Sequence, residues 1–291
     1  MSRTVARTRR RTIRRRRYLA AALGVVLLGG IAGGLFLWRS GGTPAKRPVA
    51  ATRKPPTFAV RPWSLVATLS EPVTAYASPT TTSAASTLPT AWASQFLSMP
   101  VIATVPGWDE VRVVARPPAP ATAWIPADAA VITRTPYHVV VDLGTTRLLL
   151  FGHSRLLMCA PAGVGATATP TPTGHYFVGL LVHPPPADAG TFAVVTSAVV
   201  DGVTDWEQAG NAMITIAASA GAPTQIGTTG ARTTAGSVQM SETDEDRLRP
   251  VPLGSPVDVV AALNHRLSPQ DERVCASRTG VPAIPRPHRE A

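Results

Sequence analysis

The chain has 291 residues, of which 45% are hydrophobic and 15% are charged, so its body is expected to be globular with one or two modest domains. Its net charge of +11 suggests nucleic-acid binding at first sight, but residues 1–17 hold nine arginines and no acid. With those nine charges set aside, +2 remains for residues 18–291. The basicity therefore belongs to an N-terminal tail, and no nucleic-acid partner is predicted.

A membrane anchor is predicted directly after the basic tail, at residues 18–38. It contains an uncharged apolar run, Leu19–Trp38, and 20 helical residues span roughly 30 Å, the thickness of a hydrocarbon core. Tyr18 and Trp38 stand at its two ends, where aromatic rings favour the headgroup layer. By the positive-inside rule the arginines keep the N-terminus in the cytoplasm. We therefore expect a single-pass protein of the cell membrane whose remaining domains lie outside the cytoplasm.

Two export signals are alternatives to an uncleaved anchor. A cleaved signal peptide has a shorter apolar region and an A-x-A-like site, and no clear site follows Trp38. The run Arg16–Leu19 is compatible with part of a twin-arginine export signal.

Two β-rich regions are predicted after a linker at residues 39–57, which is rich in Gly, Pro, Lys and Arg. In residues 58–134, short apolar runs alternate with turn formers at the spacing of a small barrel or sandwich, interrupted by a loop at Ser78–Thr90. Residues 135–262 continue with further strands. One short helix is expected late in this region, where Ser241 can cap a first turn rich in acidic residues.

The C-terminal residues, 263–291, are polar and rich in Pro and Arg, so a mobile or docked tail is expected. Outside the cytoplasm a disulfide can persist, and a Cys159–Cys275 bond would tie this tail to the preceding domain. Two buried, unreactive thiols are the alternative. Neither cysteine has metal-ligand spacing, so no metal or cofactor is predicted.

Four motifs occur in order in the second β-rich region. Residues 165–178 contain T-P-T-G-H-Y-F-V, residues 213–218 read M-I-T-I-A-A, residues 234–240 read T-A-G-S-V-Q-M, and residues 244–257 contain D-x(3)-L-x(2)-V-x(2)-G-x-P-V. In order and spacing these resemble the L,D-transpeptidase (YkuD) family, enzymes that cross-link peptidoglycan stem peptides. The resemblance implies a YkuD-like, β-rich domain with a short helix at residues 135–262.

The upstream region resembles the small SH3-like module that precedes this catalytic domain in some Gram-positive enzymes. Gly107–Val111, Arg116–Pro118 and Ala123–Ile125 follow a pattern close to G-W-x-x-V, R-P and G-W-[VI]. The expected fold class is thus mainly β: an N-terminal transmembrane helix, an SH3-like β module at residues 58–134 and the transpeptidase-like domain.

The resemblance assigns the family's reactive positions to residues that lack its chemistry. Ser237 stands at the catalytic cysteine, Ala217 and Ala235 stand at the two motif histidines, and Gln239 stands at the arginine. A hydroxyl needs an adjacent base far more than a thiol does. Since both base positions hold methyl groups, the resemblance implies a centre without a nucleophile–base pair.

Other histidines are candidates for a displaced base. His175 follows the T-P-T-G loop and His183 lies on the next strand or its turn. His138 and His153 are expected on surface strands or turns, and Cys159 is expected to be structural.

Three functions follow from these expectations. The first is a catalytically inactive transpeptidase-like protein that binds the cell wall or regulates active wall enzymes. The second is a residual or altered acyl-transfer enzyme that uses Ser237, with His175 as its base. The third is a structural adaptor whose upstream module binds wall glycan or protein. Peptidoglycan stem peptides or glycan are the expected partners in each case.

Overall fold

The computed structural model describes residues 60–114, 121–183, 192–200, 212–218, 225–226, 229–263 and 267–276. These residues all belong to one compact unit, Pro56–Ala291. The predicted basic tail, the membrane anchor and the whole of the linker at residues 39–57 lie outside them. Among the residues described, no helix has the length and apolar character needed to cross a bilayer.

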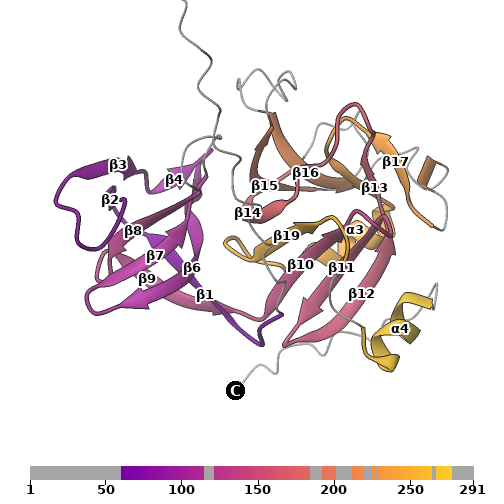
Figure 1. Cartoon of the computed structure of the whole chain (residues 1–291), viewed down its shortest axis with the longest axis horizontal. Helices are drawn as coiled ribbons and strands as arrows, with labels where there is room; N and C mark the ends of the chain where they lie inside the picture. The colour runs from indigo at the N-terminus through magenta and orange to yellow at the C-terminus, as the bar shows by residue number, and fades with distance from the viewer. Residues whose placement is uncertain are drawn as a thin grey trace, which may run out of the picture. The chain divides into compact units, whose positions relative to one another are not determined.

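The described part of the chain is mainly β, as the sequence predicts (Figure 1). It contains a seven-stranded sheet, a ten-stranded sheet and a two-stranded ribbon. The chain passes from the first sheet to the second at Pro136, between β9, which ends at Thr135, and β10, which begins at Tyr137.

The seven-stranded sheet has the order β3-β2-β8-β7-β6-β1-β9. Its strands are β1 (Ser64–Leu69), β2 (Val73–Tyr76), β3 (Ala84–Leu88), β6 (Ser98–Val105), β7 (Trp108–Arg112), β8 (Thr122–Pro126) and β9 (Ala130–Thr135), and the ribbon is β4 (Ala91–Trp92) with β5 (Gln95–Phe96). Buried and part-exposed residues alternate along β7 and β8, which is the period of a half-buried strand. Met99, Val111 and Ile125 are fully buried between the strands.

The loop predicted at Ser78–Thr90 is wrong in part, because β3 lies within it and pairs with β2. Four of the five β3 residues are exposed and only Leu88 is buried. Because apolar and polar residues do not alternate in β3, its sequence pattern does not predict a strand. It is a strand because its backbone pairs with β2.

The ten-stranded sheet has the order β12-β11-β10-β19-β14-β15-β16-β18-β13-β17. Its strands are β10 (Tyr137–Asp142), β11 (Arg147–Gly152), β12 (Arg155–Pro161), β13 (Gly163–Gly165), β14 (Gly174–Val182), β15 (Ala193–Val200), β16 (Ala212–Ala218), β17 (Ala231–Thr234), β18 (Val238–Met240) and β19 (Pro256–Val260). Two of its pairings, β10 with β19 and β16 with β18, are parallel and join segments far apart in the chain.

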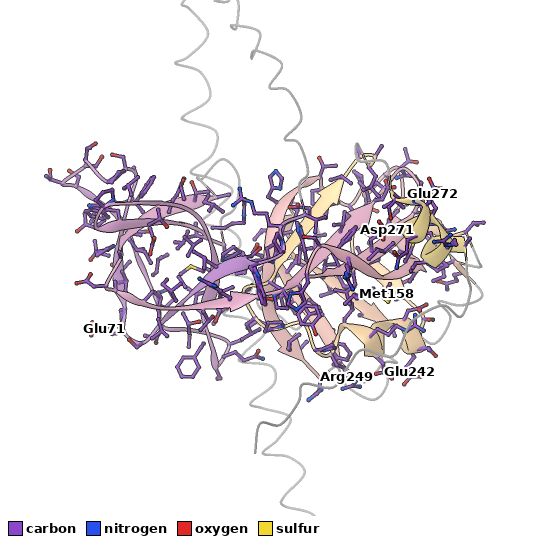
Figure 2. The ribbon with its side chains drawn as sticks, turned by 90° about the horizontal axis from the view of Figure 1, so that it is seen from below. Glu71, Met158, Glu242, Arg249, Asp271 and Glu272 are labelled. Carbon is purple, nitrogen blue, oxygen red and sulfur yellow. A yellow bond between two sulfur atoms is a disulfide. The ribbon has the colours of Figure 1, made fainter. Side chains whose placement is uncertain are left out.

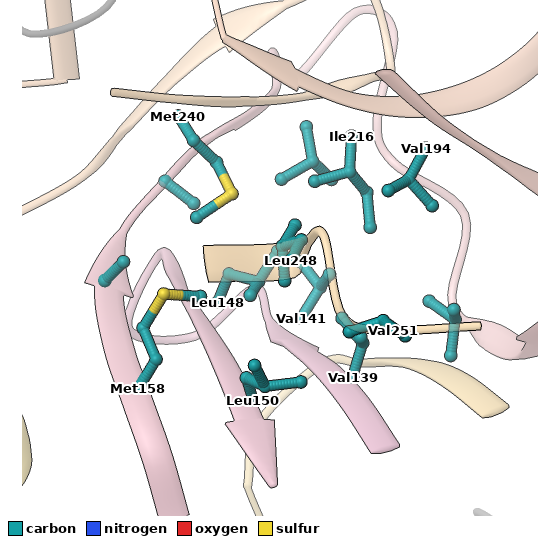
Figure 3. Packing of buried hydrophobic residues seen from close by; sticks show 14 of the residues in the cluster. Val139, Val141, Leu148, Leu150, Met158, Val194, Ile216, Met240, Leu248 and Val251 are labelled. Carbon is teal, nitrogen blue, oxygen red and sulfur yellow. The ribbon is translucent and has the colours of Figure 1, made fainter. Parts of the chain in front are cut away.

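Two apolar clusters pack against the second sheet. The larger one is shown in Figure 3, and the smaller one contains Val140, Leu149, Phe151 and Leu156. Leu148, Met158, Ile216, Met240 and Leu248 come from different elements and are each no more than 1% exposed. The charged residues Glu71, Glu242 and Glu272 lie on the outside (Figure 2), whereas Glu245 and Asp258 are buried.

Helix α3 (Glu242–Glu245) and the 3₁₀ turn η2 (Asp246–Leu248) form where the sequence predicts a helix. The Ser241 hydroxyl caps α3 by accepting a hydrogen bond from the amide of Asp244 at 3.2 Å. The C-terminal tail contains a further helix, α4 (Pro269–Ala276), and a disulfide joins Cys275 of α4 to Cys159 of β12. That part of the tail is therefore docked.

Residues of the second region pack against the seven-stranded sheet and against the two-stranded ribbon. Phe177 of β14 is fully buried within the core of the seven-stranded sheet. The Gln95 amide donates to the carbonyl of Leu181 at 2.7 Å and accepts from its amide at 3.1 Å. Gly254 has a φ of +78°, and a Cβ there would overlap Val66 and make a tight contact with Ser98. These contacts make the boundary between the sheets a packed interface.

Candidate functional site

The structure brings together the segments that correspond to the transpeptidase reactive motifs. β16 and β18 are parallel neighbours, with Ala217 opposite Gln239 and Ile216 opposite Val238. Ser237 precedes β18 and lies beside Thr215, one residue earlier in the same register. The four positions assigned by resemblance are thus close neighbours, although Ala217 and Ser237 are twenty positions apart in the sequence.

Ser237 is partly exposed and accepts hydrogen bonds from two threonines, Thr215 and Thr234. Its Oγ accepts from the Thr215 hydroxyl at 3.1 Å and from the Thr215 amide at 3.4 Å, while the Thr234 hydroxyl donates to the Ser237 carbonyl. No histidine, cysteine or carboxylate of the described residues forms a hydrogen bond with Ser237. A serine hydroxyl needs an adjacent base to become a good nucleophile, and the part of the chain that is described places none in hydrogen-bonding contact with Ser237.

The other motif positions supply no proton acceptor either. Ala217 is partly buried and Ala235 is exposed, and both end in a methyl group. The side-chain oxygen of Gln239 is buried and has no hydrogen-bond partner within the part of the chain that is described. An amide is not basic, so Gln239 cannot replace a histidine.

The loop before the T-P-T-G segment packs against the loop that carries Ser237. Thr169 donates its hydroxyl proton to the carbonyl of Thr234 at 3.2 Å, and the amide of Gly165 donates to Thr171 Oγ1 at 2.8 Å. Gly236 has a φ of +110°, a conformation that favours glycine over residues with a Cβ. The motif loops therefore keep a defined arrangement around the substituted centre.

His175, the candidate displaced base, lies elsewhere. It stands on β14 directly opposite Asp258 of β19, and its Nδ1 is 2.6 Å from Asp258 Oδ1. No contact joins it to Ser237 among the residues described. His183, the second candidate, is exposed just after β14. The structure thus brings neither histidine to the serine.

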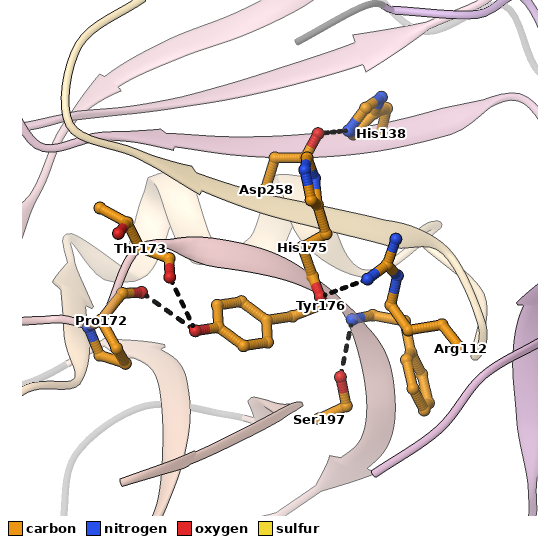
Figure 4. A network of polar contacts seen from close by, with 9 residues as sticks. Arg112, His138, Pro172, Thr173, His175, Tyr176, Ser197 and Asp258 are labelled. Carbon is orange, nitrogen blue, oxygen red and sulfur yellow. Dashed lines mark hydrogen bonds and ion pairs between the residues drawn. The ribbon is translucent and has the colours of Figure 1, made fainter. Parts of the chain in front are cut away.

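His138 shares the same carboxylate, and the expectation of a surface position for it is wrong. It is 6% exposed, and its Nε2 lies 3.0 Å from Asp258 Oδ2 (Figure 4). His138 lies on β10 and Asp258 on β19, which are parallel neighbours near the centre of the sheet. A histidine there can be buried because the carboxylate offsets the cost of removing its polar atoms from water. His153, in contrast, is exposed at a turn, where its ring contacts Trp63.

The two histidines control the ionisation of Asp258. Burial by itself raises the pKa of this carboxyl, but the hydrogen bonds and charges of His138 and His175 outweigh burial and lower the pKa to about 2. The carboxyl is therefore ionised at neutral pH. An ionised carboxylate only accepts hydrogen bonds, so His138 Nε2 and His175 Nδ1 must both carry protons.

Arg112 and Tyr176 border this cluster. The Arg112 guanidinium donates from Nη1 to the carbonyl of His175 at 3.0 Å. Burial lowers the pKa of Arg112, and the negative charge of Asp258 opposes that shift. Burial likewise raises the pKa of Tyr176, whose hydroxyl lies 3.3 Å from the carbonyls of Pro172 and Thr173. Figure 4 shows these side chains around β14.

A cleft of about 460 Å³ opens onto the cluster. Its walls include Leu65 and Arg112 of the first sheet, His175 and Asp258 of the second, and Arg61 and Trp63 from the segment before β1. Among the residues that the structure describes, no group of three or more His, Cys, Asp or Glu side chains is placed to hold a metal ion. The cluster offers hydrogen-bonding and charged groups rather than a cation site.

Sequence reasoning missed Asp258, although a signal was present. It is the single charged residue in the apolar strand Pro256–Val260. A buried carboxylate in such a strand requires partners, which marks the position as unusual. The identity of those partners, His138 and His175, was not readable because they lie 120 and 83 positions away.

No protein-family model matches the sequence, and no curated protein matches it. Among solved structures, the chain is similar to an L,D-transpeptidase from Mycobacterium smegmatis, with 15% identity and a TM-score of 0.34 over 56% of this chain and 90% of that one. It is also similar to L,D-transpeptidase 3 from Mycobacterium tuberculosis, with 13% identity and a TM-score of 0.36 over 48% of this chain and 74% of that one.

A third similar structure is an Enterococcus faecium L,D-transpeptidase, with 19% identity and a TM-score of 0.33 over 43% of this chain. The match spans half the length of that protein. All three are L,D-transpeptidases, the family that the motifs resemble. Similarity at these TM-scores carries no argument about activity, so the chemistry depends on the residues of this chain.

Proposed function

We propose that this chain is a membrane-anchored, peptidoglycan-associated protein that keeps a transpeptidase-like frame without performing acyl transfer. The observation that carries the proposal is the environment of Ser237. Its hydroxyl accepts hydrogen bonds from Thr215, and Ala217 and Ala235 stand where the resemblance expects histidines.

Physical reasoning explains why this arrangement should be inactive. A serine hydroxyl is a weak nucleophile at neutral pH unless an adjacent base removes its proton. Loss of a general base typically costs a factor of about 10² to 10⁴ in rate. Replacement of the more nucleophilic thiol by a hydroxyl adds to this loss.

The ordered motif loops favour a retained binding or regulatory role. The Thr169 contact with Thr234 and the Gly165 contact with Thr171 hold the segments around Ser237. A frame of this kind can bind a wall peptide or an active wall enzyme without turning it over. Peptidoglycan stem peptides are the ligands that the resemblance suggests.

Covalent labelling tests the absence of acyl transfer. The full-length protein is incubated with a carbapenem and analysed by intact-mass spectrometry, with Ser237→Ala as the matched control. We expect no added mass on either protein. A stoichiometric adduct on the wild type that disappears in Ser237→Ala would show that Ser237 is a working nucleophile, and the proposal would be wrong.

Co-sedimentation with purified peptidoglycan tests the binding role. We expect the full-length protein to pellet with the wall and the Ser237→Ala variant to pellet equally, since no covalent step is involved. Recovery of both proteins entirely in the supernatant would contradict a wall-binding role.

The location is part of the proposal. An anchor at residues 18–38 with a cytoplasmic basic tail would hold the β-rich part near the wall. Protease added outside intact cells should digest residues 56–291, while deletion of residues 1–38 should abolish membrane association. Full protection of the C-terminal part from external protease would overturn this placement.

A further inference from the structure

The cleft beside Asp258 contains an arginine, Arg112, that has few hydrogen-bond partners among the described residues. Arg112 is half-buried and has five donor hydrogens, yet a single side-chain hydrogen bond, to the carbonyl of His175, is found for it among the described residues. No carboxylate in that part of the chain forms a salt bridge with it. The other donors of Arg112 are not among the fully buried, unpaired atoms of the described residues, and Arg112 lines the cleft, so an acceptor from outside can reach them.

Asp258 has the largest electrostatic effect on Arg112 of any charged group, yet it forms no salt bridge with it. Its two oxygens accept hydrogen bonds from His138 and His175 instead. Glu110 adds a weaker attraction without forming an ion pair with Arg112. The Arg112 guanidinium therefore lies close enough to two carboxylates to be influenced by their charge, but it forms an ion pair with neither among the described residues.

His175 presents a second group to the same cleft. Its side chain is 31% exposed, and its Nδ1 proton is committed to Asp258. Its Nε2 has no hydrogen bond among the residues described. When the ring carries a proton on both nitrogens, Nε2 is a second donor beside Arg112.

The outer wall of the cleft is apolar and aromatic. Trp63 is 46% exposed and Leu65 is 36% exposed, and both line the cleft together with Arg61. Exposed large apolar side chains beside a few convergent polar groups are typical of a ligand site. The body of a ligand can pack on Trp63 while a charged group reaches Arg112.

We propose that this cleft binds an oxyanion, the carboxylate or phosphate group of a ligand, through the guanidinium of Arg112 and the imidazole of His175. A guanidinium has the planar, two-pronged donor geometry that matches such groups. The site is separate from the Ser237 centre and does not depend on peptidoglycan binding.

Titration of the full-length protein with simple anions tests the site. The protein is labelled with ¹⁵N in its six histidine rings, and sodium acetate or sodium phosphate is added at constant ionic strength, with sodium chloride as the reference. We expect a saturable shift of the His175 resonance with acetate, phosphate or both, and none with chloride. A response to one anion alone identifies the carboxylate or the phosphate as the preferred group.

Two arginine variants separate a specific site from general attraction. In Arg112→Gln we expect the Kd to rise about 10-fold or more, the size of a lost charge-assisted hydrogen bond. Arg155→Gln removes an exposed arginine on β12 and should leave the Kd unchanged. If Arg112→Gln does not fold, Arg112→Lys keeps the charge but loses the planar fork, and should bind about 3-fold more weakly or worse.

Three results would overturn the proposal. The first is no saturable shift with either anion. The second is an unchanged Kd in Arg112→Gln, or in Arg112→Lys when that variant has to be used. The third is an equal loss of binding in Arg155→Gln, which would indicate general charge attraction.

Discussion

His175 and Asp258 form a cross-strand pair in which imidazole Nδ1 lies 2.6 Å from carboxylate Oδ1, although 83 positions separate them in the sequence. His138 binds the other oxygen of the same carboxylate. One ionised side chain thus fixes the orientation of two imidazole rings from two strands that flank its own. The following predictions test this cluster and the packing around it.

Asp258 should account for part of the stability that the protein loses as the pH falls below about 4. Its folded pKa of about 2 lies below the ordinary value of 3.8, so its stabilising effect is complete above about pH 4 and is lost as the pH falls through about 2. The shift corresponds to about 2 kcal/mol. We therefore compare the free energy of unfolding of the wild type and of Asp258→Asn by chemical denaturation at pH 6 and at pH 2. The difference between the two proteins should be smaller at pH 2 by about that amount.

The control for this experiment is Glu71→Gln, which removes an exposed carboxylate. The free energy of unfolding of this variant should differ from that of the wild type by nearly the same amount at pH 6 and at pH 2. A difference between wild type and Asp258→Asn that is the same at both pH values would contradict the assigned ionisation.

The His138 contact should stabilise the fold. His138→Asn shortens the side chain, so a buried, ionised Asp258 loses one of its two donors. We expect a loss of about 2 kcal/mol in the free energy of unfolding at pH 7. His153→Asn changes an exposed histidine whose φ of +50° asparagine tolerates, and should change stability by less than about 0.5 kcal/mol. Equal effects of the two substitutions would refute the buried pair.

Two glycines should respond differently to the same substitution. Gly107 and Gly254 have φ values of +81° and +78°, so alanine costs about 1 kcal/mol of backbone strain at either position. A Cβ at Gly107 meets no atom within 4 Å, whereas at Gly254 it overlaps Val66 and makes a tight contact with Ser98. Thermal and chemical denaturation should therefore give a loss of about 3 kcal/mol or more for Gly254→Ala. Similar losses at both positions would mean that the two sheets are not packed as described.

The disulfide should hold α4 on the second sheet. The bond joins residues 116 positions apart, and removing a disulfide typically costs about 2–4 kcal/mol. Cys275→Ser should lower the free energy of unfolding by this amount and speed hydrogen exchange in residues 269–276. A reducing agent should destabilise the wild type to the same level and leave the variant unchanged. Equal stability of oxidised and reduced wild type would contradict a stabilising bond.

The sequence alone was informative wherever a signal is local. Alternating apolar residues and turn formers predict the β character of the chain because a strand has a period of two. Ser241 followed by acidic residues predicts α3 because capping acts within one turn. The motifs around Ser237 indicate which segments belong together. In contrast, β3 was missed because its residues are nearly all exposed and only pairing with β2 makes them a strand.

The sequence by itself determined that this chain carries serine and alanine where the L,D-transpeptidase motifs that it resembles carry cysteine and histidine. Only the tertiary structure decided what surrounds those residues: the Ser237 hydroxyl faces Thr215, while His175 and His138 are bound to Asp258 in another part of the sheet. The physical reason is that hydrogen bonding and burial depend on neighbours across strands. Those neighbours are set by strand order and register, which join residues distant in the chain.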